Sequence, residues 1–118
     1  MKNKIIKKPW GQEEIIEHNQ YYVVKKLTMY KGHKCSLQYH DFKHETIYIL
    51  SGALRIFVGK DLKKNSNIES SLFYTGDSII LTPGVVHRME AEEDSVYLEA
   101  STPQLEDVIR LEDDYERR

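Results

Sequence analysis

Two short stretches of this 118-residue chain carry side chains that could bind a metal ion. The first runs from Gly32 to Gly52 and contains Gln38, His40 and Glu45, and the second begins at Gly76 and ends at His87. Gln38 and His40 are two positions apart, so on a β-strand both side chains point to the same face. Two imidazoles, a carboxylate and a carboxamide form a suitable ligand set for one divalent ion. The sequence therefore predicts a metal site in a protein built from strands.

The candidate ligands differ in strength. His40 and His87 are the central pair, and if they share an ion their imidazoles should lie within about 6 Å of each other. The amide oxygen of Gln38 is a weaker donor, so Gln38 either completes the metal shell or hydrogen-bonds a substrate or a metal-bound water, with His44 as the replacement ligand. Nitrogen and oxygen donors suit Zn²⁺, the leading expectation, or Mn²⁺, Fe²⁺, Co²⁺ or Ni²⁺. Cys35 is out of phase with Gln38 and is expected in the core, on the opposite side of its strand.

The composition excludes several classes of protein. A formal net charge of −2 with interspersed charges disfavours nucleic-acid binding. One cysteine cannot form an internal disulfide, which fits a reducing cytoplasm. The cationic N-terminus has no apolar core of a signal peptide, and no apolar run approaches a membrane span. We expect a soluble, cytoplasmic protein with one domain over residues 1–118.

Alternation of apolar and polar residues predicts an all-β sandwich or barrel. The four residues before Glu45 suit a hairpin return, Ser51-Gly52 and Gly59–Asp61 suit tight turns between paired strands, and Lys60–Ser70 suits a surface loop. Near-helical spacing after Pro103 predicts a short C-terminal helix or turn. The expected strands are Glu14–His18, Tyr21–Met29, Cys35–Tyr39, Glu45–Leu50, Ala53–Val58, Ser71–Tyr74, Ser78–Leu81, His87–Glu90 and Ser95–Ser101.

These motifs resemble those of the cupin superfamily, whose fold is a small double-stranded β-helix or jelly-roll barrel. Gly32–Gly52 resembles the first cupin motif and Gly76–His87 the second, with Thr82 in place of the usual proline and Ala91 in place of the usual asparagine. Further similarity points to the C-terminal cupin domain of type II mannose-6-phosphate isomerases, in a stand-alone form. It is carried by Lys8–Gly11, Val24-Lys25, Ser36–His40, His87-Arg88, Glu99 and Asp107–Tyr115.

The resemblance implies a metal-dependent aldose–ketose isomerase acting on a sugar phosphate such as mannose 6-phosphate. Gln38, His40, Glu45 and His87 would hold the metal, and Lys25 and Arg110 would bind the phosphate. The implied catalytic residues are Lys25, Glu99 and Arg110. Lys25 and Glu99 are alternative bases, as is Glu45 if it does not bind the metal. Arg110 could instead form a salt bridge with Glu112 or Asp113. The chain departs from the family at Thr46, Asp41–Lys43 and Glu116, which puts the exact sugar in question because the 41–43 loop rims the predicted cavity.

Two other classes of function remain open. His40, Glu45 and His87 without Gln38 would form the two-histidine, one-carboxylate triad of non-haem iron oxygenases. A non-catalytic cupin that binds a metal or a sugar, or that supports a separate nucleotidyltransferase in polysaccharide synthesis, is the third class. The resemblance also implies a homodimer, in which edge strands are protected.

Overall fold

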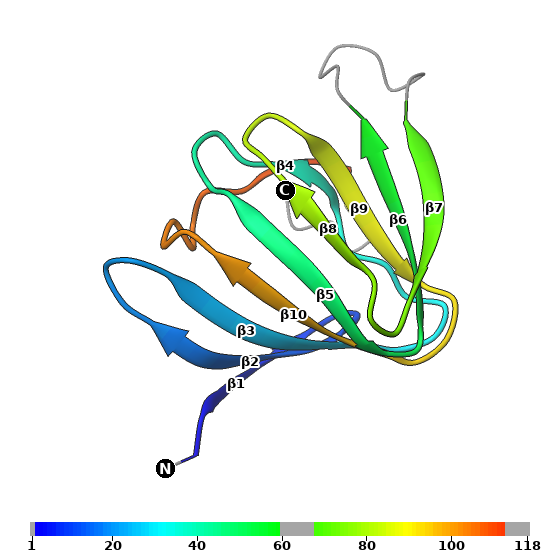
Figure 1. The fold of residues 1–118 in the computed structure, drawn as a ribbon, viewed down its shortest axis with the longest axis horizontal. Coiled ribbons are helices and arrows are strands. Elements are labelled where there is room, and N and C mark those ends of the chain that lie inside the picture. Colours follow the sequence, from blue (N-terminus) through cyan, green and yellow to red (C-terminus); the bar gives the residue numbers. More distant parts are fainter. Residues whose placement is uncertain (1, 60–67, 113–118) are drawn as a thin grey trace.

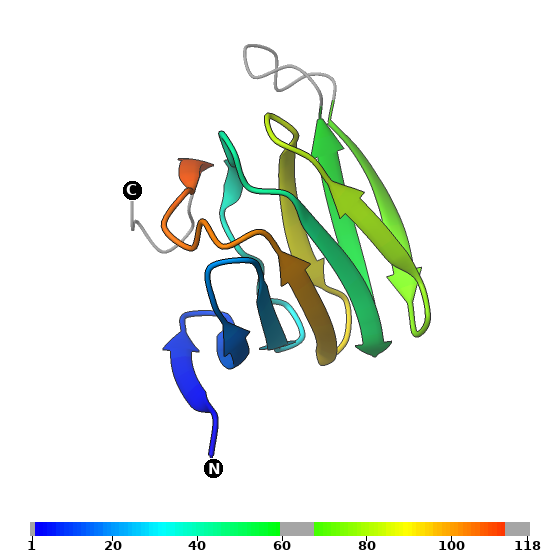
Figure 2. The ribbon, with the colours of Figure 1, turned by 60° about the vertical axis from the view of Figure 1, so that its left-hand side comes forward.

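The computed structural model describes residues 2–59 and 68–112, and within them every regular element is a strand. The strands form two antiparallel sheets that face each other (Figures 1 and 2). The first sheet has the order β1-β2-β3-β10-β5-β8 and the second has the order β11-β4-β9-β6-β7. The strands are β1 (Lys4–Lys8), β2 (Gly11–His18), β3 (Val23–Met29), β4 (Leu37–Tyr39), β5 (Glu45–Ser51), β6 (Ala53–Gly59), β7 (Glu69–Tyr74), β8 (Ser78–Leu81), β9 (Val86–Ala91), β10 (Ser95–Ser101) and β11 (Ile109–Glu112).

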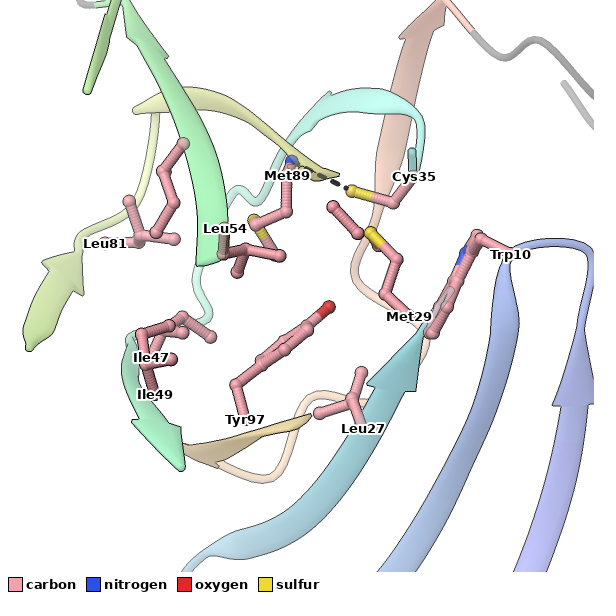
Figure 3. Close-up of a cluster of buried hydrophobic side chains, with 12 residues drawn as sticks. Trp10, Leu27, Met29, Cys35, Ile47, Ile49, Leu54, Leu81, Met89 and Tyr97 are labelled. Carbon is pink, nitrogen blue, oxygen red and sulfur yellow. Dashed lines mark hydrogen bonds between the residues drawn. The ribbon is translucent and has the colours of Figure 1, made fainter. Parts of the chain in front are cut away.

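The alternating sequence pattern translates directly into an inner and an outer face. Along β3, β5 and β10 every second residue is buried over most of the strand. The buried positions are mostly apolar, and they form one core around Tyr97, as Figure 3 shows. Burial of such side chains contributes roughly 1.5–3 kcal/mol each to folding. Lys25, Glu45 and Glu99 occupy inward positions of the same three strands, so the fold also brings charges inside.

Consecutive strands often lie in different sheets, which corrects two predictions. β4 and β5 do not form a hairpin, because β4 pairs with β9 and β11 whereas β5 pairs with β10 and β8. The loop 41–44 crosses between the sheets instead. Ser51-Gly52 likewise crosses from β5 to β6 rather than joining paired strands. Gly52 has φ +92°, and an added Cβ would lie 2.4 Å from the Asp94 carbonyl oxygen, so a side chain there is strained and blocked.

The ends of the chain hold two strands that the sequence pattern did not predict. β1 pairs with β2, and β11 pairs with β4. The predicted C-terminal helix is wrong: a turn at residues 105–106 leads into β11, so only the alternative of a turn is confirmed. The predicted turn Gly59–Asp61 and the loop Lys60–Ser70 lie largely outside the described residues, although β7 already begins at Glu69. The described residues contain no helix that could cross a membrane.

Candidate metal centre and cavity

His40, Glu45 and His87 meet between the two sheets. His40 follows β4, Glu45 is the first residue of β5, and His87 lies in β9. The Oε1 atom of Glu45 lies 3.2 Å from His40 Nε2 and 3.1 Å from His87 Nε2, and the two imidazole centroids are 5.1 Å apart. All three side chains are almost completely buried. The two imidazoles therefore lie within the distance that a shared ion requires.

The second nitrogen of each imidazole is already engaged. His40 Nδ1 donates to the backbone carbonyl of Asp107, and His87 Nδ1 lies 3.0 Å from the carbonyl of Val85. A carbonyl oxygen only accepts, so Nδ1 carries a proton in both rings, and Nε2 of each ring points to the Glu45 carboxylate. A nitrogen lone pair and a carboxylate oxygen repel each other at this distance, so each Nε2 must either carry a proton or share a bound cation with Glu45.

These atoms fit a divalent metal. His87 Nε2 is buried and makes no hydrogen bond among the described residues. Ligands bound tetrahedrally at about 2.0–2.1 Å are roughly 3.3 Å apart, close to the separations found around Glu45 Oε1. Backbone acceptors that hold the distal nitrogen of a histidine are the usual support of a metal ligand. Two imidazoles and a carboxylate suit Zn²⁺, Mn²⁺, Fe²⁺, Co²⁺ and Ni²⁺.

Lys43 links this cluster to a second buried carboxylate. Its Nζ lies 3.3 Å from Glu45 Oε2 and 3.1 Å from Glu99 Oε2, with the lysine side chain only 7 % exposed. Burial lowers the pKa of Lys43, but Glu99 and Glu45 outweigh it and raise that pKa, so the ammonium form is favoured. Burial would raise the pKa of Glu45, yet contacts with His40 and His87 and the charge of Lys43 hold it well below its usual range. Glu45 is therefore a carboxylate.

Glu99 has the opposite electrostatic balance. Burial and the charge of Glu45 raise the pKa of its carboxyl, and Lys43 and Lys25 only partly oppose them. A carboxyl whose pKa moves toward neutrality can both accept and release a proton under working conditions. Glu99 is the residue of the described chain whose position and environment best suit acid–base chemistry beside the cluster.

A cavity of about 240 Å³ extends outward from His40 and Lys43. One wall belongs to strands β2, β3 and β10, and the other to the 41–44 loop, β4 and the chain that leads into β11. Four cationic side chains and two carboxyl groups line it, with Glu45 and His87 behind the lining. The cations are Lys8, Lys25, Lys43 and Arg110, and the carboxyl groups are Glu13 and Glu99. The excess of positive charge suits an anionic ligand.

Two of the lysines that line the cavity, Lys8 and Lys25, are held by one carboxylate. Lys25 Nζ lies 3.3 Å from Glu13 Oε2, and Lys8 Nζ lies 3.7 Å from Glu13 Oε1. Arg110 has no comparable ion pair among the described residues, and its Nε is buried without a hydrogen-bond partner. Glu112, its predicted partner, lies 3.9 Å from Arg88 instead. Asp113 is outside the described residues.

Gln38 lies beside the cluster, in register with His87 on β9 and with Arg110 on β11. Its Oε1 accepts a hydrogen bond of 2.6 Å from Ser36 Oγ, and the side chain also lines the cavity. The amide oxygen has a second lone pair. Gln38 therefore lies next to His87 and at the cavity wall, and its role as a metal ligand or as a partner of a bound molecule stays a prediction.

The structure brings together seven residues that the sequence singled out. Gln38, His40, Glu45, His87, Lys25, Glu99 and Arg110 all lie in the cluster or along the cavity. His44, the replacement ligand, is exposed and lies outside the cluster. Cys35 is in the core as expected, but the prediction that it faces away from Gln38 is wrong: both line the cavity, because β4 starts only at Leu37 and strict alternation does not extend to Cys35.

Lys43 and Asp107 are the important residues that sequence reasoning missed. Lys43 precedes Glu45 by two positions, the spacing that places side chains on one face of an extended chain, so this relation to Glu45 could have identified it. Asp107 opens the tail Asp107–Tyr115 that resembles the family, but no spacing in the sequence relates it to the 41–43 loop. Its carboxylate accepts the backbone N–H groups of Asp41, Phe42 and Lys43, and although its slight burial acts in the other direction, these bonds lower its pKa.

Comparison with known proteins identifies the relatives of this arrangement. A family profile described as "Mannose-6-phosphate isomerase C-terminal" matches residues 1–114. The mannose-1-phosphate guanylyltransferase ManC of Salmonella typhimurium is 30% identical over 113 residues, which cover 93% of this chain and 22% of ManC. The chain thus spans about a fifth of the length of the curated relatives it matches.

Solved structures share the fold at low sequence identity. The capsular polysaccharide assembling protein CapF of Staphylococcus aureus superposes with a TM-score of 0.80 at 16% identity, covering 93% of this chain and 34% of CapF. Oxalate decarboxylase of Bacillus subtilis, described with Mn(II) centres, gives a TM-score of 0.76 at 20% identity, covering 92% of this chain and 30% of the enzyme. The two-sheet architecture is the cupin double-stranded β-helix. The match over residues 1–114 shows that this cupin belongs to the family of the mannose-6-phosphate isomerase C-terminal domain.

Proposed function

We propose that the protein is a metal-dependent sugar-phosphate isomerase of the mannose 6-phosphate type. The observation that carries the proposal is the continuity between the His40–Glu45–His87 cluster and a cavity with four cationic side chains. His40, Glu45 and His87 would hold one divalent ion, with Gln38 as the fourth protein ligand. A bound ion would supply Lewis-acid stabilisation of negative charge on substrate oxygens.

The side chains of the cavity would bind and orient the substrate. Arg110 has an unpartnered buried Nε, so a phosphate could take a hydrogen bond that no described residue provides. Lys25 would add a second positive charge from the opposite wall, at the cost of weakening its contact with Glu13. The relatives' names refer to mannose 1-phosphate, which supports a phosphorylated sugar as the ligand class.

Proton movement between adjacent substrate carbons needs a group that exchanges protons near neutrality. Glu99 meets this condition best, because its pKa is raised by burial and by Glu45. Lys43 contacts Glu99 and would keep part of its negative charge stabilised after proton release. Lys25 lies directly opposite Glu99 in the β3–β10 register and is the alternative proton carrier. Glu45 is less suited, because its pKa is held low.

A non-catalytic role is the second candidate. It is favoured by the relatives named as mannose-1-phosphate guanylyltransferases, of which this chain spans about a fifth. In that case the cupin would bind a sugar phosphate and support a separate nucleotidyltransferase in polysaccharide synthesis. A cytoplasmic location and a homodimer fit both candidates and stay proposals.

One experiment separates these functions. Purified protein is stripped of metal, reloaded with Zn²⁺, Mn²⁺, Fe²⁺, Co²⁺ or Ni²⁺, and assayed for conversion of mannose 6-phosphate to fructose 6-phosphate. Metal-dependent conversion that Glu99→Gln removes supports the isomerase, and Glu92→Gln, at an exposed carboxylate, is the control. Stoichiometric metal and sugar-phosphate binding without conversion would establish the accessory role instead. Oxygen consumption by the Fe²⁺ form would assign the cluster to a non-haem iron oxygenase.

A further inference from the structure

Asp107 occupies an unusual position beside the His40–Glu45–His87 cluster. It lies in the connection between β10 and β11, far in sequence from the first two members of the cluster. Its Oδ1 accepts the backbone N–H of Asp41 at 3.0 Å, and its Oδ2 accepts those of Phe42 and Lys43 at 2.8 and 2.9 Å. Three successive amides converging on one carboxylate form an anion-binding nest, which the protein fills with its own side chain.

The loop that Asp107 holds contains the segment between two cluster residues. Residues 41–43 join His40 to Glu45, and they carry Lys43, which contacts Glu45 and Glu99. This loop crosses between the sheets, so no strand partner satisfies the amides of Asp41, Phe42 and Lys43. Without the carboxylate those three amides would turn to water, and the position of Lys43 would be less restricted.

The backbone of Asp107 acts on His40 directly. Its carbonyl oxygen accepts the Nδ1 proton of His40, which leaves Nε2 facing Glu45. A hydrogen bond of this kind fixes both the tautomer and the orientation of a ligand histidine. One residue therefore restrains the imidazole with its carbonyl and the adjoining loop with its carboxylate.

Other hydrogen bonds hold the residues at the two ends of the same loop. Thr102 exchanges two hydrogen bonds of 3.0 Å with His44, through its backbone N–H and its Oγ1. The N–H of Gly84 donates to the carbonyl of His40 at 2.8 Å. These contacts hold the two ends of the loop, whereas Asp107 holds its middle.

We infer that Asp107 is a positioning residue that sets the geometry of His40 and Lys43 for metal binding. The inference rests on the proposed function of the cluster as a metal site. It predicts that loss of the carboxylate loosens the 41–43 loop and weakens metal affinity without unfolding the barrel, because Asp107 itself is near the surface.

The test compares Asp107→Ala and Asp107→Asn with Asp77→Ala. Asp77 is a matched control, since its Oδ2 also accepts a backbone N–H, that of Tyr74 at 2.8 Å, but in the β7–β8 turn. In metal-free protein, amide exchange of residues 41–43 should accelerate at least tenfold in Asp107→Ala, while strand amides keep their rates. Zinc affinity, measured by competition with a chromophoric chelator, should fall about ten- to hundredfold.

Asp107→Asn retains one acceptor oxygen and should give a smaller loss of affinity, so it keeps the test decisive if the alanine variant folds poorly. Asp77→Ala should change neither the 41–43 exchange rates nor the zinc affinity. Unchanged exchange at 41–43 in both Asp107 variants would overturn the inference. If wild-type protein binds no metal, the proposed function fails. In that case the amide exchange rates of residues 41–43 and the ¹⁵N shifts of the His40 imidazole still decide whether Asp107 positions the loop and the ring.

Discussion

The two walls of the cavity are built in different ways. The strand wall presents Glu13, Lys25 and Glu99 from β2, β3 and β10, where cross-strand pairing fixes each position. The loop wall presents Lys43 from the 41–44 crossing and Arg110 from β11. There the positions are fixed by hydrogen bonds from loop amides to the Asp107 carboxylate and by the pairing of a short edge strand. Side chains on the strand wall inherit their direction from the sheet, whereas those on the loop wall depend on individual contacts.

Because of this difference, the two walls should respond differently to substitution. A substitution on the strand wall removes one side chain and leaves the backbone in register, so its effect should stay local. Loss of a loop-wall side chain that pairs with the cluster, such as Lys43, also changes the restraint on its neighbours, so its effect should spread to the metal cluster. Substitutions on the two walls should therefore differ in effect, and the largest effect is expected at Glu45, where the two walls meet.

Glu45→Gln should have the largest effect. Glu45 starts a strand of the first sheet but contacts His40 and His87 from the second, and it also neutralises Lys43. An amide removes the anionic ligand and leaves Lys43 with one carboxylate, so zinc affinity should fall by more than the roughly 100-fold seen for residues behind the ligands. Competition with a chromophoric chelator measures it. An affinity within a factor of three of wild type would contradict the metal assignment.

Lys43→Met and Lys25→Met compare the two walls directly. Both lysines are buried and paired, but Lys43 separates two carboxylates, while Glu13 retains Lys8 when Lys25 is lost. Removing one partner of a buried ion pair costs about 3–5 kcal/mol. We expect the free energy of unfolding to fall by that amount in Lys43→Met. In Lys25→Met it should fall by roughly 1 kcal/mol, because Glu13, the partner of Lys25, still contacts Lys8. Urea unfolding at pH 7 with a chelator present measures both, and equal losses would refute the asymmetry.

The same asymmetry explains what the sequence could predict. Lys25 and Glu99 were identified by the family resemblance, and His40, Glu45 and His87 by the spacing of the two motifs; strand alternation, a local property, accounts for the inward positions of Lys25, Glu45 and Glu99 in the structure. The crossing of the 41–44 loop was mistaken for a hairpin, because pairing between distant strands decides which sheet a strand joins. The family resemblance placed the 41–43 loop, with Lys43, at the rim of the cavity. It also marked Asp107 as part of the tail, but the contacts of Asp107 with that loop span more than 60 residues of sequence and have no local signal.

β11 is a second case in which pairing between distant strands, rather than the local sequence pattern, decides the structure. Its apolar residues recur at spacings that also fit a helical turn, so the sequence pattern predicted a short helix or a turn rather than a strand. Pairing with β4 decides in favour of the strand, because the second sheet offers β11 an unpaired edge that a helix would leave exposed. Arg110 therefore faces the cavity from a strand, which no local propensity could specify.

Cys35 provides a pH test of the core beneath the cavity. Burial raises the pKa of its thiol to about 11, although the Met89 amide and Arg88 oppose the change. A raised pKa means that the unfolded chain releases the proton first, so stability is constant below about pH 9 and falls as pH approaches 11. The loss should reach about 2–3 kcal/mol, at 1.36 kcal/mol for each pKa unit. Urea unfolding between pH 8 and 11 measures this loss of stability. The Cys35→Ala variant has no thiol and should not show it.

At neutral pH the same burial should make the Cys35 thiol slow to react with iodoacetamide in folded protein and fast in urea, because the thiolate is the nucleophile. Rapid alkylation of the native protein would place Cys35 in an open part of the cavity. Reaction rates equal to those of the unfolded chain would contradict the burial found for this thiol.

Arg110→Gln should have the smallest effect and the most selective one. The Arg110 guanidinium lines the cavity without an ion pair, so its loss leaves no described carboxylate unpaired and should cost little stability. Affinity for a sugar phosphate should fall about tenfold, the lower end of the range expected for a hydrogen bond to a charged group, which is worth roughly 1.5–3 kcal/mol, while affinity for the unphosphorylated sugar should not change. Calorimetric titration with both ligands measures the difference, and Arg55→Gln, at an exposed ion pair with Glu92, is the control.

An equal loss for both ligands would mean that Arg110 shapes the loop wall rather than binding phosphate. The loop wall would then consist of positioning contacts, and the strand wall would have to supply the charge that selects the ligand.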